Sequence, residues 1–131
     1  MKPIALAVFA LVLLATNLII GEADEAPLPY SPSKHQIMVK AAMEFRASYE
    51  KLYIVAKCES SLNENAWNKT DPNGGSKGIF QFQTPTFLQG AKEIGITNPD
   101  IWSVEQQSRV AAYLFSQKKT SLWSCARKHG I

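Results

Sequence analysis

The sequence predicts a small, mainly α-helical domain. Apolar residues recur at helical spacing in two long segments, residues 37–56 and 104–115. Residues that start and stop helices flank these segments, and runs typical of strands are nearly absent. The chain has 131 residues and an apolar fraction of 46%, which suits one globular domain.

The N-terminus has the pattern of a secretory signal peptide. Lys2 precedes an almost wholly apolar run, residues 4–20, and small residues follow at 21–23. An uncleaved membrane anchor over residues 4–20 is the alternative. Residues 24–33 contain three prolines and are typical of a linker. We therefore expect a signal peptide or anchor (1–23), a linker (24–33) and a domain (34–131), secreted, periplasmic or held at the cell envelope.

The first half of the domain is predicted to be helical. Ser33 is a candidate N-cap, and the apolar positions continue to Cys58, either as one helix or as two with a break near Ser48. A turn-rich segment follows, with residues 71–75 reading Asp-Pro-Asn-Gly-Gly. A short apolar run, residues 79–82, completes this half.

Two further helices and a short terminal one are expected in the second half. Thr84 is a candidate cap with proline at the first helical position, and this helix ends by Gly90 or Gly95. Ser103 caps the next helix, and Gln106 makes a capping box possible. Lys118 and Lys119 would lie near the C-terminus of that helix, where positive charge is favourable. The last helix runs from about residue 120 to Gly130.

The two cysteines, Cys58 and Cys125, fit an exported domain with one disulfide. Such a bridge would close most of the domain into a loop and stabilise it by roughly 4 kcal/mol in the chain-entropy model. No histidine pair accompanies them, so we expect no metal and no cofactor. The net charge of +3 favours an anionic polymer or surface. No basic stripe supports nucleic-acid binding.

Glu59 directly follows Cys58 at the end of the apolar helix. Partial burial there would raise the pKa of the carboxyl group, as protonation of a glycosidic oxygen requires. Most glutamates at helix ends are simply solvated, so the residue type alone does not assign a catalytic role.

A set of short motifs surrounds Glu59. Glu59-Ser60 is followed by Asn63, by residues 66–68 (Ala-Trp-Asn) and by residues 75–81 (Gly-Ser-Lys-Gly-Ile-Phe-Gln). This pattern resembles the catalytic core of lytic transglycosylases of the lysozyme-like superfamily, which also includes goose-type lysozymes. The resemblance covers about residues 52–125 and implies a small lysozyme-like helical domain.

The resemblance implies a reaction. Glu59 would protonate the oxygen of the MurNAc-GlcNAc β-1,4 bond in peptidoglycan, then remove the proton from the 6-hydroxyl to form 1,6-anhydro-MurNAc. Substrate contacts are expected from a set of residues near it: Ser60, Ser76, Gly78, Gln81, Tyr113 and Trp123. The partners implied are peptidoglycan strands and, around them, a cell-envelope assembly.

The sequence departs from the family near its C-terminus, where an Ala-Tyr-Asn-Ala-Gly motif is replaced by Trp123-Ser124-Cys125. Two alternatives therefore stay open. One is a lysozyme-type hydrolase, for which Asp71 would be the second carboxylate. A purely structural role for Asp71, as the first residue of a turn, is nevertheless favoured. The other is a non-catalytic glycan-binding or assembly protein on the same scaffold.

Overall fold

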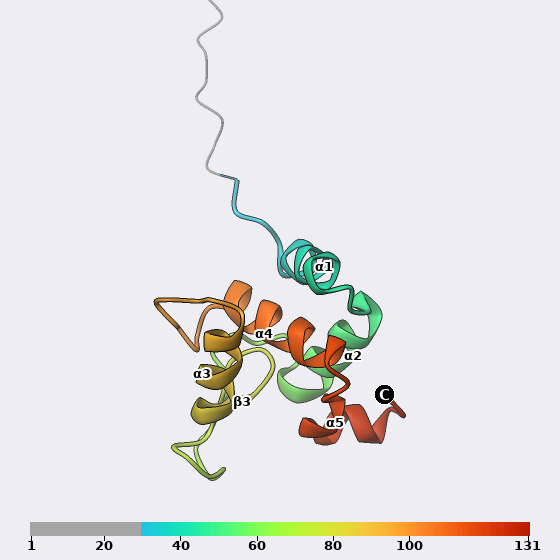
Figure 1. Cartoon of the computed structure of the whole chain (residues 1–131). Helices are drawn as coiled ribbons and strands as arrows, with labels where there is room; N and C mark the ends of the chain where they lie inside the picture. Colours follow the sequence, from blue (N-terminus) through green and yellow to red (C-terminus); the bar gives the residue numbers. More distant parts are fainter. Residues whose placement is uncertain (1–29) are drawn as a thin grey trace, which may run out of the picture. The chain divides into compact units, whose positions relative to one another are not determined.

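The computed structural model describes residues 30–131 (Figure 1). The predicted signal peptide or anchor and most of the linker lie outside the described residues. Within residues 30–131, no helix has both the length and the apolar character needed to cross a membrane.

The first helical segment is two helices, α1 (Lys34–Phe45) and α2 (Tyr49–Ser60). Ser33 caps α1 in a complete capping box with Gln36. Arg46 takes a left-handed conformation that ends α1, and the Ser48 hydroxyl caps α2. Of the two alternatives, one helix or two with a break near Ser48, the structure shows the second, and the cause of the break is local capping chemistry.

Three two-residue strands form a small antiparallel sheet in the order β1 (Trp67–Asn68), β2 (Ser76–Lys77), β3 (Phe82–Gln83). Asn68 pairs with Ser76, and Ser76 pairs with Gln83. Strands this short have no alternating pattern, so the sequence did not indicate them.

The predicted start of α3 (Thr84–Glu93) is wrong by one residue. Gln83 is the N-cap and makes no side-chain cap bond, so Thr84 is already helical and Pro85 is the second helical residue. Proline is tolerated there because the first helical N–H groups have no partner within the helix.

Helix α4 (Val104–Ser116) begins at the predicted cap, Ser103, but the capping box does not form. The Gln106 side chain instead accepts a bond from the Asp100 N–H (2.7 Å) and donates to the Asn98 carbonyl (3.2 Å). It therefore ties the preceding turn to the helix.

The end of the chain is divided more finely than expected. Lys118 and Lys119 lie beyond the last turn of α4. The predicted terminal helix is a 3-10 turn, η1 (Thr120–Leu122), followed by α5 (Ser124–Lys128). Gly130, with φ of +68°, follows α5.

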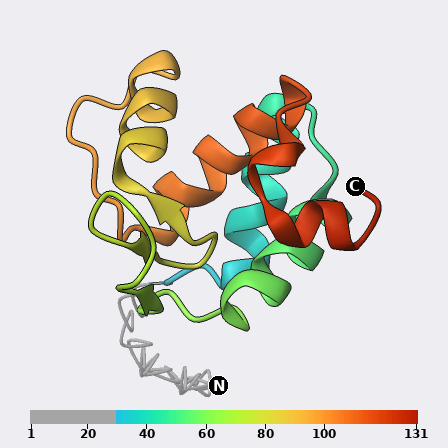
Figure 2. The same cartoon turned by 90° about the horizontal axis from the view of Figure 1, so that it is seen from below.

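Helix α4 runs through the middle of the unit, packed against α1 and α2 on one side and α3 on the other (Figure 2). Its Gln107 is completely buried, accepts a bond from the Phe80 N–H (2.9 Å) and donates to the Lys77 carbonyl (2.8 Å). Gly78 lies against this amide with φ of +78°, and a Cβ there would overlap the Gln107 side chain. Gln107 thus holds the segment from β2 to β3 in place.

A disulfide joins Cys58 of α2 to Cys125 of α5, as predicted. The two residues are 67 positions apart, so the bridge links the first half of the domain to its last helix.

Candidate active site

A cleft of about 600 Å³ opens where the end of α2, the sheet, the start of α3 and α5 meet. Polar groups dominate its walls, as suits a ligand rich in hydroxyl and amide groups. The residues that line it are Glu59, Asn68, Asp71, Ser76, Gln81, Phe82, Gln83, Thr86, Leu122, Trp123, Ser124 and Arg127.

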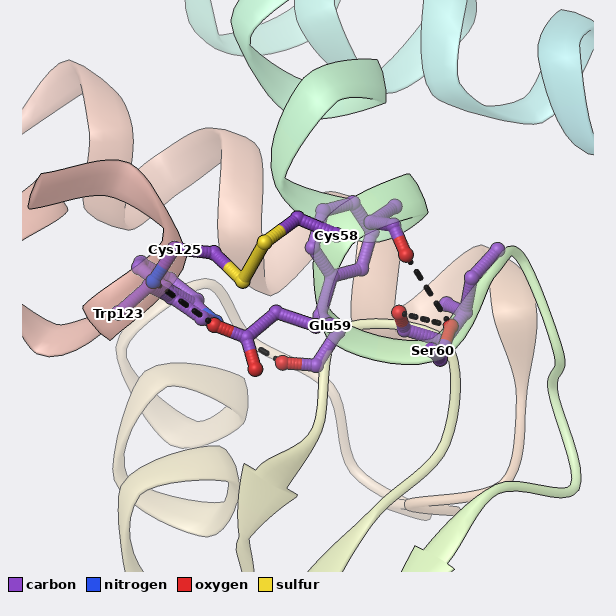
Figure 3. The surroundings of a disulfide bond; sticks show 8 residues. Cys58, Glu59, Ser60, Trp123 and Cys125 are labelled. Carbon is purple, nitrogen blue, oxygen red and sulfur yellow. Dashed lines mark hydrogen bonds between the residues drawn. A yellow bond between two sulfur atoms is a disulfide. The ribbon is translucent and has the colours of Figure 1, made fainter. Parts of the chain in front are cut away.

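Glu59 lies in the last turn of α2, directly beside the disulfide (Figure 3). Its Oε1 accepts a hydrogen bond from the Cys125 N–H at 3.3 Å. Because Cys58 precedes Glu59 and is bonded to Cys125, the disulfide keeps this N–H next to the carboxyl group. The covalent bridge therefore positions Glu59 at the cleft.

The surroundings raise the pKa of Glu59 above its ordinary value. Partial burial of the carboxyl group is the main cause, because it disfavours the charged form. The Cys125 N–H lowers the pKa, the negative charge of Asp71 raises it and the positive charge of Arg127 lowers it. The net result is a carboxyl group that keeps its proton to a higher pH than an ordinary glutamate does.

Asp71 lies in the same cleft as Glu59. Its carboxylate accepts a hydrogen bond from the Ser76 hydroxyl at 2.6 Å, which holds the loop over β2. The turn interpretation of Asp71 is thus incomplete, because the side chain also presents a second carboxylate to the cleft.

Trp123 forms a wall of the cleft and is only 4% exposed. Its indole N–H donates to the Phe80 carbonyl at 2.9 Å (Figure 3), and its ring packs edge-on against Phe82 and Phe115. A buried indole whose N–H has a partner is a rigid wall.

Gln81 is also in the cleft, in a left-handed conformation with φ of +52°. Its amide nitrogen donates to the carbonyls of Ala66 (3.1 Å) and Gly78 (2.9 Å). These bonds hold the side chain against the loop that leads to β2. Four predicted site residues therefore share this cleft: Glu59, Ser76, Gln81 and Trp123.

The other three predicted contacts do not line the cleft. Ser60 bonds the Ile79 carbonyl at 2.7 Å (Figure 3), which joins α2 to the segment before β3. Gly78 makes room for the Gln107 amide. Tyr113 packs edge-on against Phe45. That any of these three residues touches substrate stays a prediction.

Sequence reasoning assigned no role to several cleft residues: Asn68, Phe82, Gln83, Thr86, Leu122, Ser124 and Arg127. Asn68 and Gln83 reach the cleft through their register with Ser76, a pairing that the sequence did not reveal. Arg127 reaches it through α5, whose position depends on the disulfide. Within residues 30–131, no group of three or more His, Cys, Asp or Glu side chains is placed to hold a metal ion.

Comparison with known proteins agrees with this geometry. Residues 36–124 match the family model described as the transglycosylase SLT domain. That range includes Glu59, α4 and every residue that lines the cleft except Arg127. A search of curated proteins and a search of solved structures each found no match. Because the family model covers more than half of the chain, this protein belongs to the transglycosylase SLT domain family, whose members are lytic transglycosylase-type, glycan-cleaving domains.

Proposed function

We propose that this protein is an exported peptidoglycan lytic transglycosylase in which Glu59 acts first as acid and then as base. The observation that carries the proposal is a half-buried glutamate with a raised pKa, lining an open polar cleft in a domain of this family. Peptidoglycan is the substrate class that the family implies.

The reaction balances without water or a cofactor. Protonated Glu59 transfers its proton to the oxygen of the MurNAc-GlcNAc β-1,4 bond, and the bond from C1 of MurNAc to that oxygen breaks. The 6-hydroxyl oxygen of the same MurNAc bonds to C1, and its proton passes to the Glu59 carboxylate. Glu59 is thereby restored, and the products are a new GlcNAc hydroxyl end and a 1,6-anhydro-MurNAc end.

The location and partners belong to the same proposal. Residues 1–23 would direct export or, through residues 4–20, attach the protein to a membrane, with residues 24–33 as the linker. The ligands would then be glycan strands outside the cytoplasm, where a disulfide persists. A cell-envelope assembly is a further partner in this proposal.

The test is the mass of the products. Purified peptidoglycan is incubated with the exported protein, and the released muropeptides are analysed by mass spectrometry. We expect anhydro ends, lighter by one water than reducing muropeptides, and none from the Glu59→Gln variant. Reducing ends alone would contradict the transglycosylase reaction, and no release from any peptidoglycan would contradict cleavage altogether.

Hydrolysis of the same bond is the second candidate, because Asp71 brings a second carboxylate into the cleft. In a lysozyme-type reaction that carboxylate would hold the attacking water. The Asp71→Asn variant distinguishes the two reactions. Asn can still accept the hydrogen bond from the Ser76 hydroxyl, so the variant removes the negative charge and keeps this contact. A transglycosylase keeps its activity within about tenfold, whereas a hydrolase that needs a base loses about 100-fold or more.

Removing either of two charges in the cleft, at Asp71 or at Arg127, should shift the pH dependence of cleavage, and the two shifts should have opposite directions. The rate falls as pH rises through the pKa of Glu59, because the acid form is then lost. Asp71→Asn removes a charge that raises this pKa, so the falling limb should move to lower pH. Arg127→Gln removes a charge that lowers it, so the limb should move to higher pH. Shifts of both variants in the same direction would contradict the assignment of this limb to Glu59.

A further inference from the structure

Two large aromatic side chains outside the cleft are exposed to solvent. Trp67 of β1 is 48% exposed, and Trp102, just before α4, is 38% exposed. Their rings meet edge to face, with centroids 6.1 Å apart and planes at 78°. Neither lines the catalytic cleft. A pair of exposed indoles is the kind of surface that marks a binding site.

Local contacts hold the Trp67 ring in one orientation. Its Nε1 donates to the Gly74 carbonyl at 3.1 Å. Gly75 lies so close that an added Cβ would stand 2.7 Å from this nitrogen, so the turn needs glycine for the ring to pack there. A ring that is already ordered loses little entropy when a ligand binds.

Positive charge accompanies the rings. The Lys69 Nζ lies 4.6 Å from the Trp67 ring centroid, and the Lys77 Nζ lies 5.7 Å from it. Lys77 also donates to the Thr84 hydroxyl at 3.2 Å. One negative charge also lies nearby, because the Asp100 carboxylate accepts a hydrogen bond from the backbone N–H of Trp102. We call Trp67, Trp102, Lys69 and Lys77 the tryptophan corner.

The tryptophan corner and the cleft involve the same small sheet but share no lining residue. Asn68 pairs with Ser76, and both line the cleft. Trp67 pairs with Lys77, and neither of these residues lines the cleft. A ligand on the tryptophan corner therefore does not occupy the cleft.

We propose that the tryptophan corner is a second glycan-binding site, which holds a peptidoglycan segment other than the one being cleaved. The C–H face of a sugar ring would pack on the indoles, whose ring faces carry partial negative charge. The lysines would pair with the carboxylates of the peptide stems. This proposal rests on the proposed function only because it assumes the same polymer, peptidoglycan, as the ligand. The second site would keep the enzyme bound to its insoluble substrate.

Binding to insoluble peptidoglycan tests this second site. All proteins carry Glu59→Gln, so that binding is measured by co-sedimentation without cleavage. We expect Trp67→Ala with Trp102→Ala to weaken binding about tenfold or more. Leu88→Ala is the matched control, because Leu88 is 44% exposed and lines no part of the corner or cleft; it should bind like its parent.

A second pair of variants keeps the test valid if loss of the rings disturbs the fold. Lys69→Gln with Lys77→Gln should weaken binding to peptide-bearing glycan several-fold but not to glycan stripped of its peptides. Thermal unfolding checks that each variant is folded. With Glu59 restored, the tryptophan variants should cleave short soluble fragments at the parent rate, because the cleft is intact.

The results also separate this site from other occupants. Unchanged sedimentation of folded tryptophan and lysine variants would overturn it. So would corner-dependent binding to vesicles of anionic phospholipid with unchanged peptidoglycan binding, or corner-dependent dimerisation with unchanged peptidoglycan binding. Failure of the cleavage proposal would instead show as no muropeptide release by the parent, a readout that the sedimentation assay does not use.

Discussion

Glu59→Gln is expected to lower kcat/KM for peptidoglycan by about 100-fold to 10,000-fold, the usual contribution of a general acid or base. The amide keeps the size of the side chain and can still accept the Cys125 N–H, but it has no proton of suitable acidity to donate. Rates of muropeptide release by the variant and its parent measure the effect. Binding to peptidoglycan should persist.

The same variant should not lose stability, which excludes unfolding as the cause. The pKa of Glu59 is higher in the folded state than in the unfolded state, so the folded state binds this proton more tightly. The free energy of unfolding therefore falls as the pH rises from the pKa of the unfolded state through the pKa of the folded state. Near neutral pH the Gln variant should therefore be at least as stable as its parent. The gain should be below about 1 kcal/mol, because the side chain is half exposed and screened by solvent. Full activity in the variant would contradict the assignment of Glu59 as the general acid and base.

Removal of the disulfide has the largest expected effect on stability. Cys58→Ser with Cys125→Ser opens a loop of 67 residues, and the chain-entropy model gives a loss of roughly 4 kcal/mol in the free energy of unfolding. Denaturant titration of the variant beside its oxidised parent measures the loss. Activity should fall as well, since α5 would no longer hold the Cys125 N–H against Glu59.

Reduction supplies the matched control. A thiol reductant should lower the denaturation midpoint of the parent to that of the double variant and leave the variant itself unchanged. Equal midpoints for the oxidised and reduced parent would show that the bridge adds no stability.

Local chemistry explains why the helices could be predicted. Ser33 and Ser48 cap their helices through bonds to residues three positions later, so the break between α1 and α2 is visible in sequence. The strands β1 to β3 were invisible because two residues carry no periodicity. The capping box at Ser103 does not form, because the Gln106 side chain bonds to backbone groups of the preceding turn instead. That turn is positioned by tertiary structure, which the local sequence pattern does not show.

The candidate site was only partly predictable for a similar reason. Glu59 is identified by motif, and the disulfide by the presence of only two cysteines. Asp71 and Arg127 come into the cleft through tertiary packing, which places a turn and α5 opposite the end of α2. Tyr113 packs against Phe45 because of how α4 packs against α1. That Ser76, Gln81 and Trp123 touch substrate stays a prediction.

The most direct test of whether this fold makes Glu59 a proton donor is the pKa of its carboxyl group. The chemical shift of the Glu59 side-chain carboxyl carbon is followed by NMR as pH is changed, with Glu59→Gln to assign the signal. We predict a midpoint above the ordinary glutamate value of 4.5, lowered in Asp71→Asn and raised in Arg127→Gln. A midpoint at or below 4.5 in the parent would contradict the claim that burial raises the pKa of Glu59 and suits it to donate a proton.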